Sequence, residues 1–243
     1  MAVIIIVHIP KTAGTSFRQG MLEVFGRKAL MFDYGPDAPE TDVSIRNLYK
    51  QGEFSPRRVA QETGGKECKA LCGHFPLSRY LDVFPGSTVI SFIREPLQRC
   101  YSEFLHLQRH KGYGQSFEVF FQQKGQINLQ SRWLDGLPEN GLVGVSEYYD
   151  RSLVMINRAL DISVPAFKLN TRRKNIHSPY SAGLIGKGLV RRFYELNMRD
   201  VGLYEAIARP FGDTGNSAPL TFPQRIRSLK DKLFSLPLVN RLS

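Results

Sequence analysis

Six consecutive residues near the start of the chain carry groups that bind phosphate: Lys11, Thr12, Ala13, Gly14, Thr15 and Ser16. Lysine supplies a positive charge, the hydroxyl groups supply hydrogen-bond donors, and glycine lets the backbone approach an anion closely. The apolar run before this loop predicts a buried strand, and apolar residues recur at helical spacing after it. The loop would therefore end at a helix N-terminus, whose free N–H groups and dipole attract anions. We predict that it holds a phosphate group.

This loop differs from the Walker A loop, G-x-x-x-x-G-K-[ST], in which the lysine stands directly before the last hydroxyl residue. Here Lys11 comes first, and one glycine, Gly14, follows it. An ordinary strand-to-helix turn with a serine cap is the alternative interpretation. The concentration of a lysine, a glycine and three hydroxyl groups within six residues favours the phosphate site instead.

A second group of anion-binding side chains lies much further along the chain. Arg94 follows the apolar run 87–93, and Pro96 suits the first turn of a helix on which Ser102 would lie near the second turn. The planar guanidinium fork of arginine matches the oxygens of a phosphate group. An ion pair with Glu95 is the alternative role for Arg94. Together, the two groups suit a nucleotide that carries two separate phosphates.

His74 is a candidate general base. It lies at the end of the apolar stretch 70–75, and open α/β sheets place their site residues at the carboxyl ends of strands. An imidazole can accept a proton near neutral pH. A structural, hydrogen-bonded histidine is the alternative interpretation.

These residues must be positioned by strand–loop–helix units. The apolar runs predict buried strands and the 3.6-residue periodicity predicts helices, so we expect an α/β fold with a parallel sheet flanked by helices on both faces. We expect residues 1–211 to form one domain and residues 212–243 a basic amphipathic C-terminal tail. The expected strands are 3–7, 70–75, 87–93, 142–145 and a possible one at 166–170, and the expected helices are 18–31, 44–49, 55–62, 96–109, 116–123, 148–160 and 191–208, with 33–69 otherwise irregular.

Composition indicates which kind of partner and which cellular compartment to expect. The net charge of +11 favours an anionic partner, although part of this charge is an ordinary solvated surface. Three cysteines make no disulfide framework, so we expect a reducing, cytoplasmic setting, and no His/Cys set with metal-ligand spacing appears. No signal peptide or membrane span is visible, although the chain could be trimmed from an anchored precursor. Residues 225–242 could contact a membrane surface or pack on their own domain, and basic residues are not interleaved with aromatic ones as specific nucleic-acid binding requires.

These motifs resemble the sulfotransferase family that uses 3′-phosphoadenosine 5′-phosphosulfate (PAPS). Residues 8–17 are similar to its 5′-phosphosulfate loop, and residues 93–102 are similar to its 3′-phosphate motif, with Glu95 where aspartate is common. The resemblance covers roughly residues 3–210 and implies the P-loop-kinase-like sulfotransferase fold. It also implies that the lysine and hydroxyl groups of the first motif contact the 5′-phosphosulfate, and that Arg94 and Ser102 hold the 3′-phosphate.

Weaker motifs resemble the carbohydrate-type branch, which includes heparan and uronyl 2-O-sulfotransferases. These are Gly73-His74-Phe75, Asn128-x-Gln130-x-Arg132-Trp133-Leu134 and Val143-Gly144-Val145-Ser146-Glu147. The chain is shorter than Golgi members of this branch, so we expect a soluble, bacterial-type relative.

The resemblance implies a metal-free mechanism. A hydroxyl of the acceptor, which we expect to be a glycan or glycolipid, attacks sulfur in line while His74 takes its proton and Lys11 stabilises the leaving phosphate. Arg132 is a candidate to face the acceptor. The basic residues Arg172, Arg173 and Lys174 are expected either to close over the nucleotide or to face an acidic acceptor. Two alternatives stay open. One is a nucleotide-dependent, kinase-like phosphotransferase, and the other is a non-catalytic, basic glycan-binding protein on the same scaffold.

Overall fold

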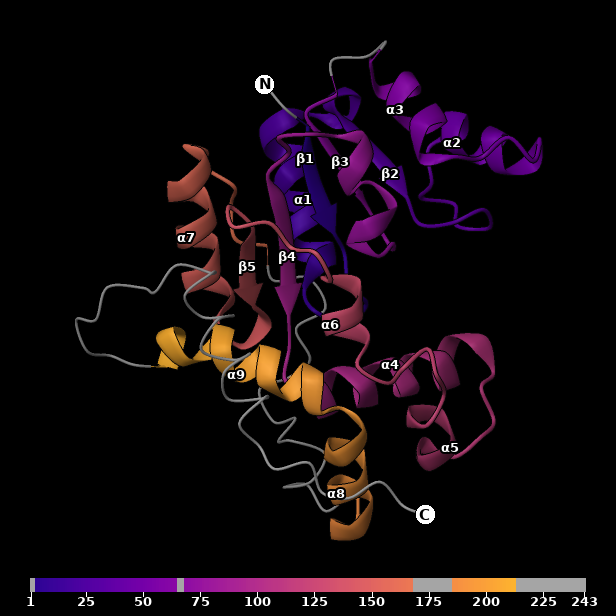
Figure 1. Ribbon diagram of the computed structural model, residues 1–243, viewed down its shortest axis with the longest axis vertical. Coiled ribbons are helices and arrows are strands. Elements are labelled where there is room, and N and C mark those ends of the chain that lie inside the picture. The colour runs from indigo at the N-terminus through magenta and orange to yellow at the C-terminus, as the bar shows by residue number, and fades with distance from the viewer. Residues whose placement is uncertain (1–2, 65–67, 168–184, 213–243) are drawn as a thin grey trace.

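Five parallel strands form one sheet in the part of the chain that the computed structural model describes, residues 3–64, 68–167 and 185–212. The strand order is β2-β3-β1-β4-β5, so the first strand lies in the middle (Figure 1). The strands are β1 (Ile4–Val7), β2 (Leu30–Asp33), β3 (Ala70–Gly73), β4 (Val89–Ile93) and β5 (Leu142–Val145). The predicted fold class, an α/β fold with a parallel sheet flanked by helices, is confirmed.

Helices cover both faces of the sheet because successive strand side chains point to opposite faces. Ile4 and Ile6 pack in the core that includes α1 (Gly14–Phe25) and α7 (Tyr149–Leu160). Ile5 and Val7 pack in the opposite core. That second core takes residues from α2 (Val43–Lys50), α3 (Pro56–Gly64), α6 (Leu129–Trp133) and α9 (Met198–Gly212).

A third apolar cluster lies beyond the carboxyl end of β4. It is built on Phe104, Phe120 and Phe193. These residues come from the three helices that gather below the sheet in Figure 1, α4 (Pro96–Lys111), α5 (Phe117–Phe121) and α8 (Lys187–Leu196). Four short 3₁₀ turns complete the described structure: Arg27–Ala29, Leu77–Arg79, Leu81–Val83 and Ser146–Tyr148.

The prediction of one helix over 18–31 was wrong at both ends. The helix begins at Gly14 and ends at Phe25, where Gly26 adopts a φ of 74° that favours glycine. The edge strand β2 follows, and it was missed because its sequence, Leu-Met-Phe-Asp, contains no β-branched residue. Its four residues are buried and pair with β3, so tertiary packing makes this segment a strand.

The prediction of one helix over 191–208 was also wrong. Helices α8 and α9 are separated at Asn197, whose side chain donates to the carbonyl of Phe193 and accepts from the backbone N–H of Asn128. The short helix α6 was not predicted. Residues 166 and 167 have no strand structure, while the rest of the expected strand 166–170 lies outside the described residues, as does nearly all of the tail 212–243. None of the helices described is long and apolar enough to cross a membrane.

Candidate active site

The loop between β1 and α1 has the backbone form of an anion site. Lys11 and Ala13 both have a φ of 68°, while Thr12 between them does not share this conformation. Such alternation turns successive N–H groups toward one side, where an anion can lie. The carbonyl of Ala13 accepts from the N–H groups of Ser16 and Phe17, at 3.1 and 3.2 Å, and so begins the helix.

The hydroxyl groups of this loop differ in what they can offer a ligand. Thr12 is buried, and its Oγ1 donates to the carbonyl of Ile9 at 2.8 Å, so its proton holds the loop together. Ser16 is buried at the start of α1, and Thr15 is half-buried beside it. Lys11 is half-buried at the start of the same turn.

Gly14 lets the start of α1 lie against His8. A Cβ atom on Gly14 would lie 2.0 Å from Cδ2 of His8, which is much closer than two non-bonded carbon atoms can approach. The backbone of the loop is therefore packed directly on an imidazole that follows β1. This contact fixes where the first turn of α1 begins.

Arg94 brings the second anion-binding group to the first. Its Nη1 donates to the carbonyl of Lys11 at 3.4 Å, although the two residues are 83 positions apart in the sequence. Its Nη2 donates to Oε1 of Gln98, also at 3.4 Å. Neighbouring parallel strands β1 and β4 end at the same edge of the sheet, so the two cationic residues meet there.

Of the four other predicted ligand-binding residues, the structure describes two, Ser102 and Arg132. Ser102 is half-buried in the second turn of α4, the helix that follows Arg94. Arg132 is exposed on α6, and its guanidinium donates to the carbonyls of Ile127 and Gly125, at 3.0 and 2.9 Å. Arg173 and Lys174 lie outside the described residues.

His74 follows β3 at the same edge of the sheet and lies among aromatic rings. Its ring centroid is 4.7 Å from that of His8, 4.6 Å from that of Tyr34 and 6.4 Å from that of Trp133. Its Nε2 is buried and has no hydrogen-bond partner among the residues that the structure describes. Burial of such a nitrogen without a partner is costly, so this atom is a candidate contact for a bound molecule.

Burial also sets the charge of this site. It lowers the pKa of His74 to about 4, helped by the positive charges of Arg18 and Lys11 and opposed by Glu40. Burial lowers the pKa of His8 well below its usual value, and His74, Arg18 and Lys11 act in the same direction. Both imidazoles are therefore neutral at pH 7, and a neutral imidazole can accept a proton.

Sequence reasoning did not select His8, Tyr34 or Arg18. Nδ1 of His8 lies 2.9 Å from the hydroxyl of Tyr34, which also lies 3.4 Å from Sγ of Cys72. The guanidinium of Arg18 stacks over the ring of Tyr34 at 5.3 Å. The signal available for His8 was its position directly after a strand, the same signal that selected His74.

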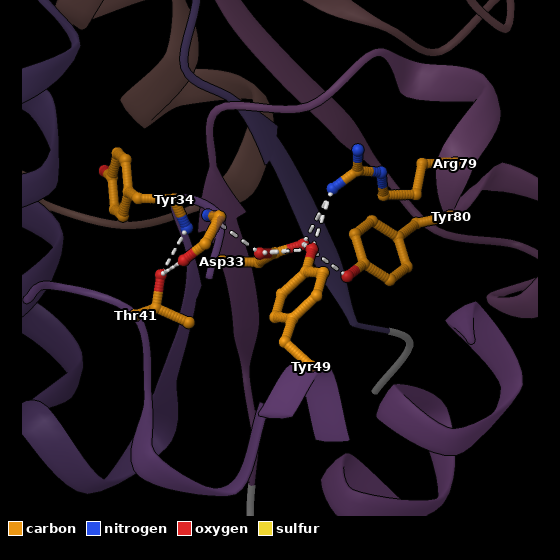
Figure 2. Close-up of polar contacts among 7 residues, drawn as sticks. Asp33, Tyr34, Thr41, Tyr49, Arg79 and Tyr80 are labelled. Carbon is orange, nitrogen blue, oxygen red and sulfur yellow. Dashed lines mark hydrogen bonds and ion pairs between the residues drawn. The ribbon is translucent and has the colours of Figure 1, made fainter. Parts of the chain in front are cut away.

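A buried carboxylate, that of Asp33, accepts hydrogen bonds from several side chains at the end of β2 (Figure 2). Asp33 ends β2, is fully buried, and accepts from the hydroxyl of Tyr80 at 2.7 Å and from that of Tyr49 at 3.1 Å. Arg79 forms an ion pair with it at 3.2 Å. The backbone carbonyl of Asp33 accepts from the N–H of His74 at 3.0 Å. Asp33 thus links β2 to α2 and to the turn after β3, and its backbone carbonyl also fixes the N–H of His74.

The described residues contain no group of three or more His, Cys, Asp or Glu side chains that could hold a metal ion. The side chains that gather at this edge of the sheet are cationic or basic. A nest of backbone N–H groups, Lys11 and Arg94 can bind anions, and His74 can take a proton beside them.

Comparison with known proteins identifies the fold of the chain. No protein-family model and no curated protein matches the chain. The mouse sulfotransferase SULT7A1, crystallised with PAP, is 15% identical, with a TM-score of 0.55 over 96% of this chain and 89% of its own. A sulfotransferase from Alicyclobacillus acidocaldarius is 16% identical, with a TM-score of 0.49 over 86% of this chain and 96% of its own. The likeness to the mouse protein shows that the chain has the sulfotransferase fold.

Proposed function

We propose that this protein is an enzyme, a PAPS-dependent sulfotransferase that moves a sulfuryl group to an acceptor hydroxyl on a carbohydrate. The observation that carries the proposal is the contact between Arg94 and the carbonyl of Lys11. It joins two anion-binding groups at one sheet edge, as a nucleotide with phosphates at both its 5′ and 3′ positions requires. The mouse protein of the same fold was crystallised with PAP, adenosine 3′,5′-bisphosphate, which supports this ligand.

The residues at the sheet edge have distinct roles in this reaction. Bound PAPS supplies an activated sulfuryl group. The loop from Lys11 to Ser16 binds its 5′ end, and Lys11 stabilises the negative charge that develops on the departing phosphate. Arg94 and Ser102 bind the 3′-phosphate, and Arg173 and Lys174 close over the nucleotide.

His74 is the general base. Its ring is neutral at pH 7 because burial lowers its pKa to about 4. Its buried Nε2 lacks a hydrogen-bond partner within the described part of the chain, and the acceptor hydroxyl would supply one. The proton leaves the hydroxyl as the oxygen bonds to sulfur and the bond from sulfur to the 5′-phosphate oxygen breaks.

The acceptor is a glycan or glycolipid in this proposal, and Arg132 faces it. Gly73-His74-Phe75 and the other motifs of the carbohydrate-type branch support this choice, as does a net charge of +11 that suits acidic glycans. Cys68, Cys72 and Cys100 are free thiols, which fits a reducing, cytoplasmic setting and a soluble, bacterial-type enzyme.

Thermal unfolding with nucleotides tests the cofactor. PAP should raise the melting temperature because a ligand that binds only the folded state stabilises it. ATP with Mg²⁺ should raise it less. A response to ATP–Mg²⁺ with indifference to PAP would instead support the kinase-like alternative.

Transfer from labelled PAPS to a panel of polysaccharides, glycolipids and small alcohols tests the reaction. Lys11→Ala should lower turnover by about 100-fold, because it removes the group that stabilises the developing charge. Arg94→Ala should lower turnover at limiting PAPS, because it weakens binding of the 3′-phosphate. Unchanged glycan binding by both variants, with no transfer by the wild type to any acceptor, would favour the non-catalytic binding protein.

A further inference from the structure

Gln130 holds the backbone of Arg94 from both sides. The N–H of Arg94 donates to Oε1 of Gln130 at 2.9 Å, and Nε2 of Gln130 donates to the carbonyl of Arg94, also at 2.9 Å. Gln130 is completely buried. The pairing of β4 with β5 ends one residue earlier, at Ile93 and Val145. The side-chain amide of Gln130 therefore makes, with the backbone of Arg94, the pair of hydrogen bonds that a neighbouring strand makes inside the sheet.

Gln130 is itself held by a buried carboxylate from α9. Oδ2 of Asp200 accepts from the N–H of Gln130 at 3.1 Å, and Oδ1 accepts from that of Ser131 at 2.7 Å. Asp200 is 2% exposed. Oδ1 of Asn128 in turn accepts from the N–H of Asp200 at 3.3 Å, so the starts of α6 and α9 cap each other.

The residue after Arg94 is fixed as well. The N–H of Glu95 donates to Oε1 of Glu147 at 2.9 Å. The side-chain carboxylate of Glu95 caps α4 by accepting from the N–H groups of Leu97 and Gln98. Arg94 thus has both its own backbone groups, and the N–H of Glu95 after it, bonded to side chains of other elements. Its side chain starts from a defined point, which lowers the ordering cost of gripping an anion.

We infer that Gln130 is the positioning residue through which the protein selects a nucleotide with a 3′-phosphate. The inference rests on the proposed function, in which Arg94 binds that phosphate. It also gives a role to the Asn128-x-Gln130-x-Arg132 motif, which the cofactor site otherwise leaves unexplained. Gln130 acts only through the backbone of Arg94 and is not itself a ligand of the phosphate.

The test compares two nucleotides that differ only in the 3′-phosphate, PAP and adenosine 5′-phosphate, by calorimetric titration of the full chain. Gln130→Met has similar volume and removes both hydrogen bonds. It should weaken PAP binding by about 10-fold or more, the usual effect of losing a charge-assisted contact, and leave adenosine 5′-phosphate binding within about 3-fold. Asn157→Leu is the matched control, because the side-chain amide of Asn157 holds the backbone of Val164 from both sides in the same way, in the segment after α7 and not beside β4. It should leave the preference for PAP unchanged.

Gln130→Glu gives a second measurement if Gln130→Met does not fold. A protonated carboxyl can both donate and accept, as the amide does, whereas a carboxylate cannot donate. Burial and the nearby carboxylate of Asp200 would raise the pKa of a glutamate at this position, so it would be protonated at pH 5.5. Relative to the wild type at the same pH, the variant's preference for PAP should therefore be restored at pH 5.5 and lost at pH 8.

The outcomes separate the two proposals. If the wild type binds PAP no better than adenosine 5′-phosphate, the proposed function is wrong. If the wild type prefers PAP and Gln130→Met keeps the same preference, or the Gln130→Glu preference does not change with pH, the positioning role of Gln130 is wrong. An equal loss of affinity for both nucleotides would mean that Gln130 only stabilises the fold.

Discussion

At the scale of single residues, the environment of His74 decides its chemistry. The ring lies against His8 and Tyr34, and its buried Nε2 has no hydrogen-bond partner in residues 3–64, 68–167 and 185–212. A histidine in water would be partly protonated near neutral pH, whereas this one is neutral because burial disfavours its charged form. The same burial has two measurable consequences, one for turnover and one for stability.

His74→Ala should bind PAP as the wild type does and lose about 100-fold or more of its turnover, because general bases contribute rate factors of this size. Turnover is measured with labelled PAPS, and binding by calorimetry. His110→Ala, which changes an exposed histidine on α4, is the control and should behave as the wild type. Full activity of His74→Ala would exclude this residue as the base.

The stability of the free protein should fall as the pH drops from about 6.5 toward 4. The pKa of His74 is lowered to about 4 in the folded state, so in this window the unfolded chain binds a proton that the folded protein excludes. The unfolded state is thereby favoured, by about 1–2 kcal/mol at pH 5 relative to pH 7 for this one residue.

Urea unfolding of the wild type and His74→Gln at the two pH values measures this effect. The variant should lose less stability than the wild type on acidification. His110→Gln is again the control. Equal losses of stability in the wild type and His74→Gln would contradict the burial of a neutral imidazole.

At the scale of elements, the start of α1 depends on a fit between backbone and ring. Gly14→Ala places a methyl group 2.0 Å from Cδ2 of His8, so the first turn of α1 or the imidazole must move. We expect the variant to fold and to lose about 10-fold or more in affinity for PAP, because displaced N–H groups no longer point at the anion.

Ala13→Gly is the matched control, since it changes one methyl group at the neighbouring position. Ala13 has a φ of 68°, which glycine adopts without strain. Its affinity for PAP should match that of the wild type, and its stability should stay within about 1 kcal/mol. If the two variants bind PAP equally well, the contact between Gly14 and His8 does not shape the loop.

At the scale of the whole molecule, the sheet edge beside His74 is held by Asp33. Its carboxylate joins β2 to Tyr49 of α2 and to Arg79 and Tyr80 after β3 (Figure 2). Asp33→Ala should lower the free energy of unfolding by about 3 kcal/mol, since it leaves the buried hydroxyl of Tyr80 and the half-buried hydroxyl of Tyr49 without their acceptor and Arg79 without its carboxylate partner. Asp37→Ala, an exposed carboxylate in the following loop, should change it by less than about 0.5 kcal/mol. Urea unfolding of both variants measures the difference, and equal stability would contradict a supporting role for Asp33.

The sequence by itself determined the features that are local in the chain. Strand β1 is a continuous β-branched run and β4 is rich in β-branched residues. The residues that follow them, from Lys11 to Ser16 and at Arg94, were predicted to bind anions from residue type and spacing. The parallel α/β class followed from these units, because strands buried on both faces need helices on each side.

The tertiary structure alone decided which of these residues meet. The order β2-β3-β1-β4-β5 brings Arg94 to Lys11, and it places His8 and Tyr34 against His74. No local pattern predicts β2, since it is a strand through its pairing with β3, and none predicts that Gln130 would hold the backbone of Arg94. The physical reason is that these contacts join residues far apart in the chain, so they depend on the strand order and packing of the whole sheet, which no single segment encodes.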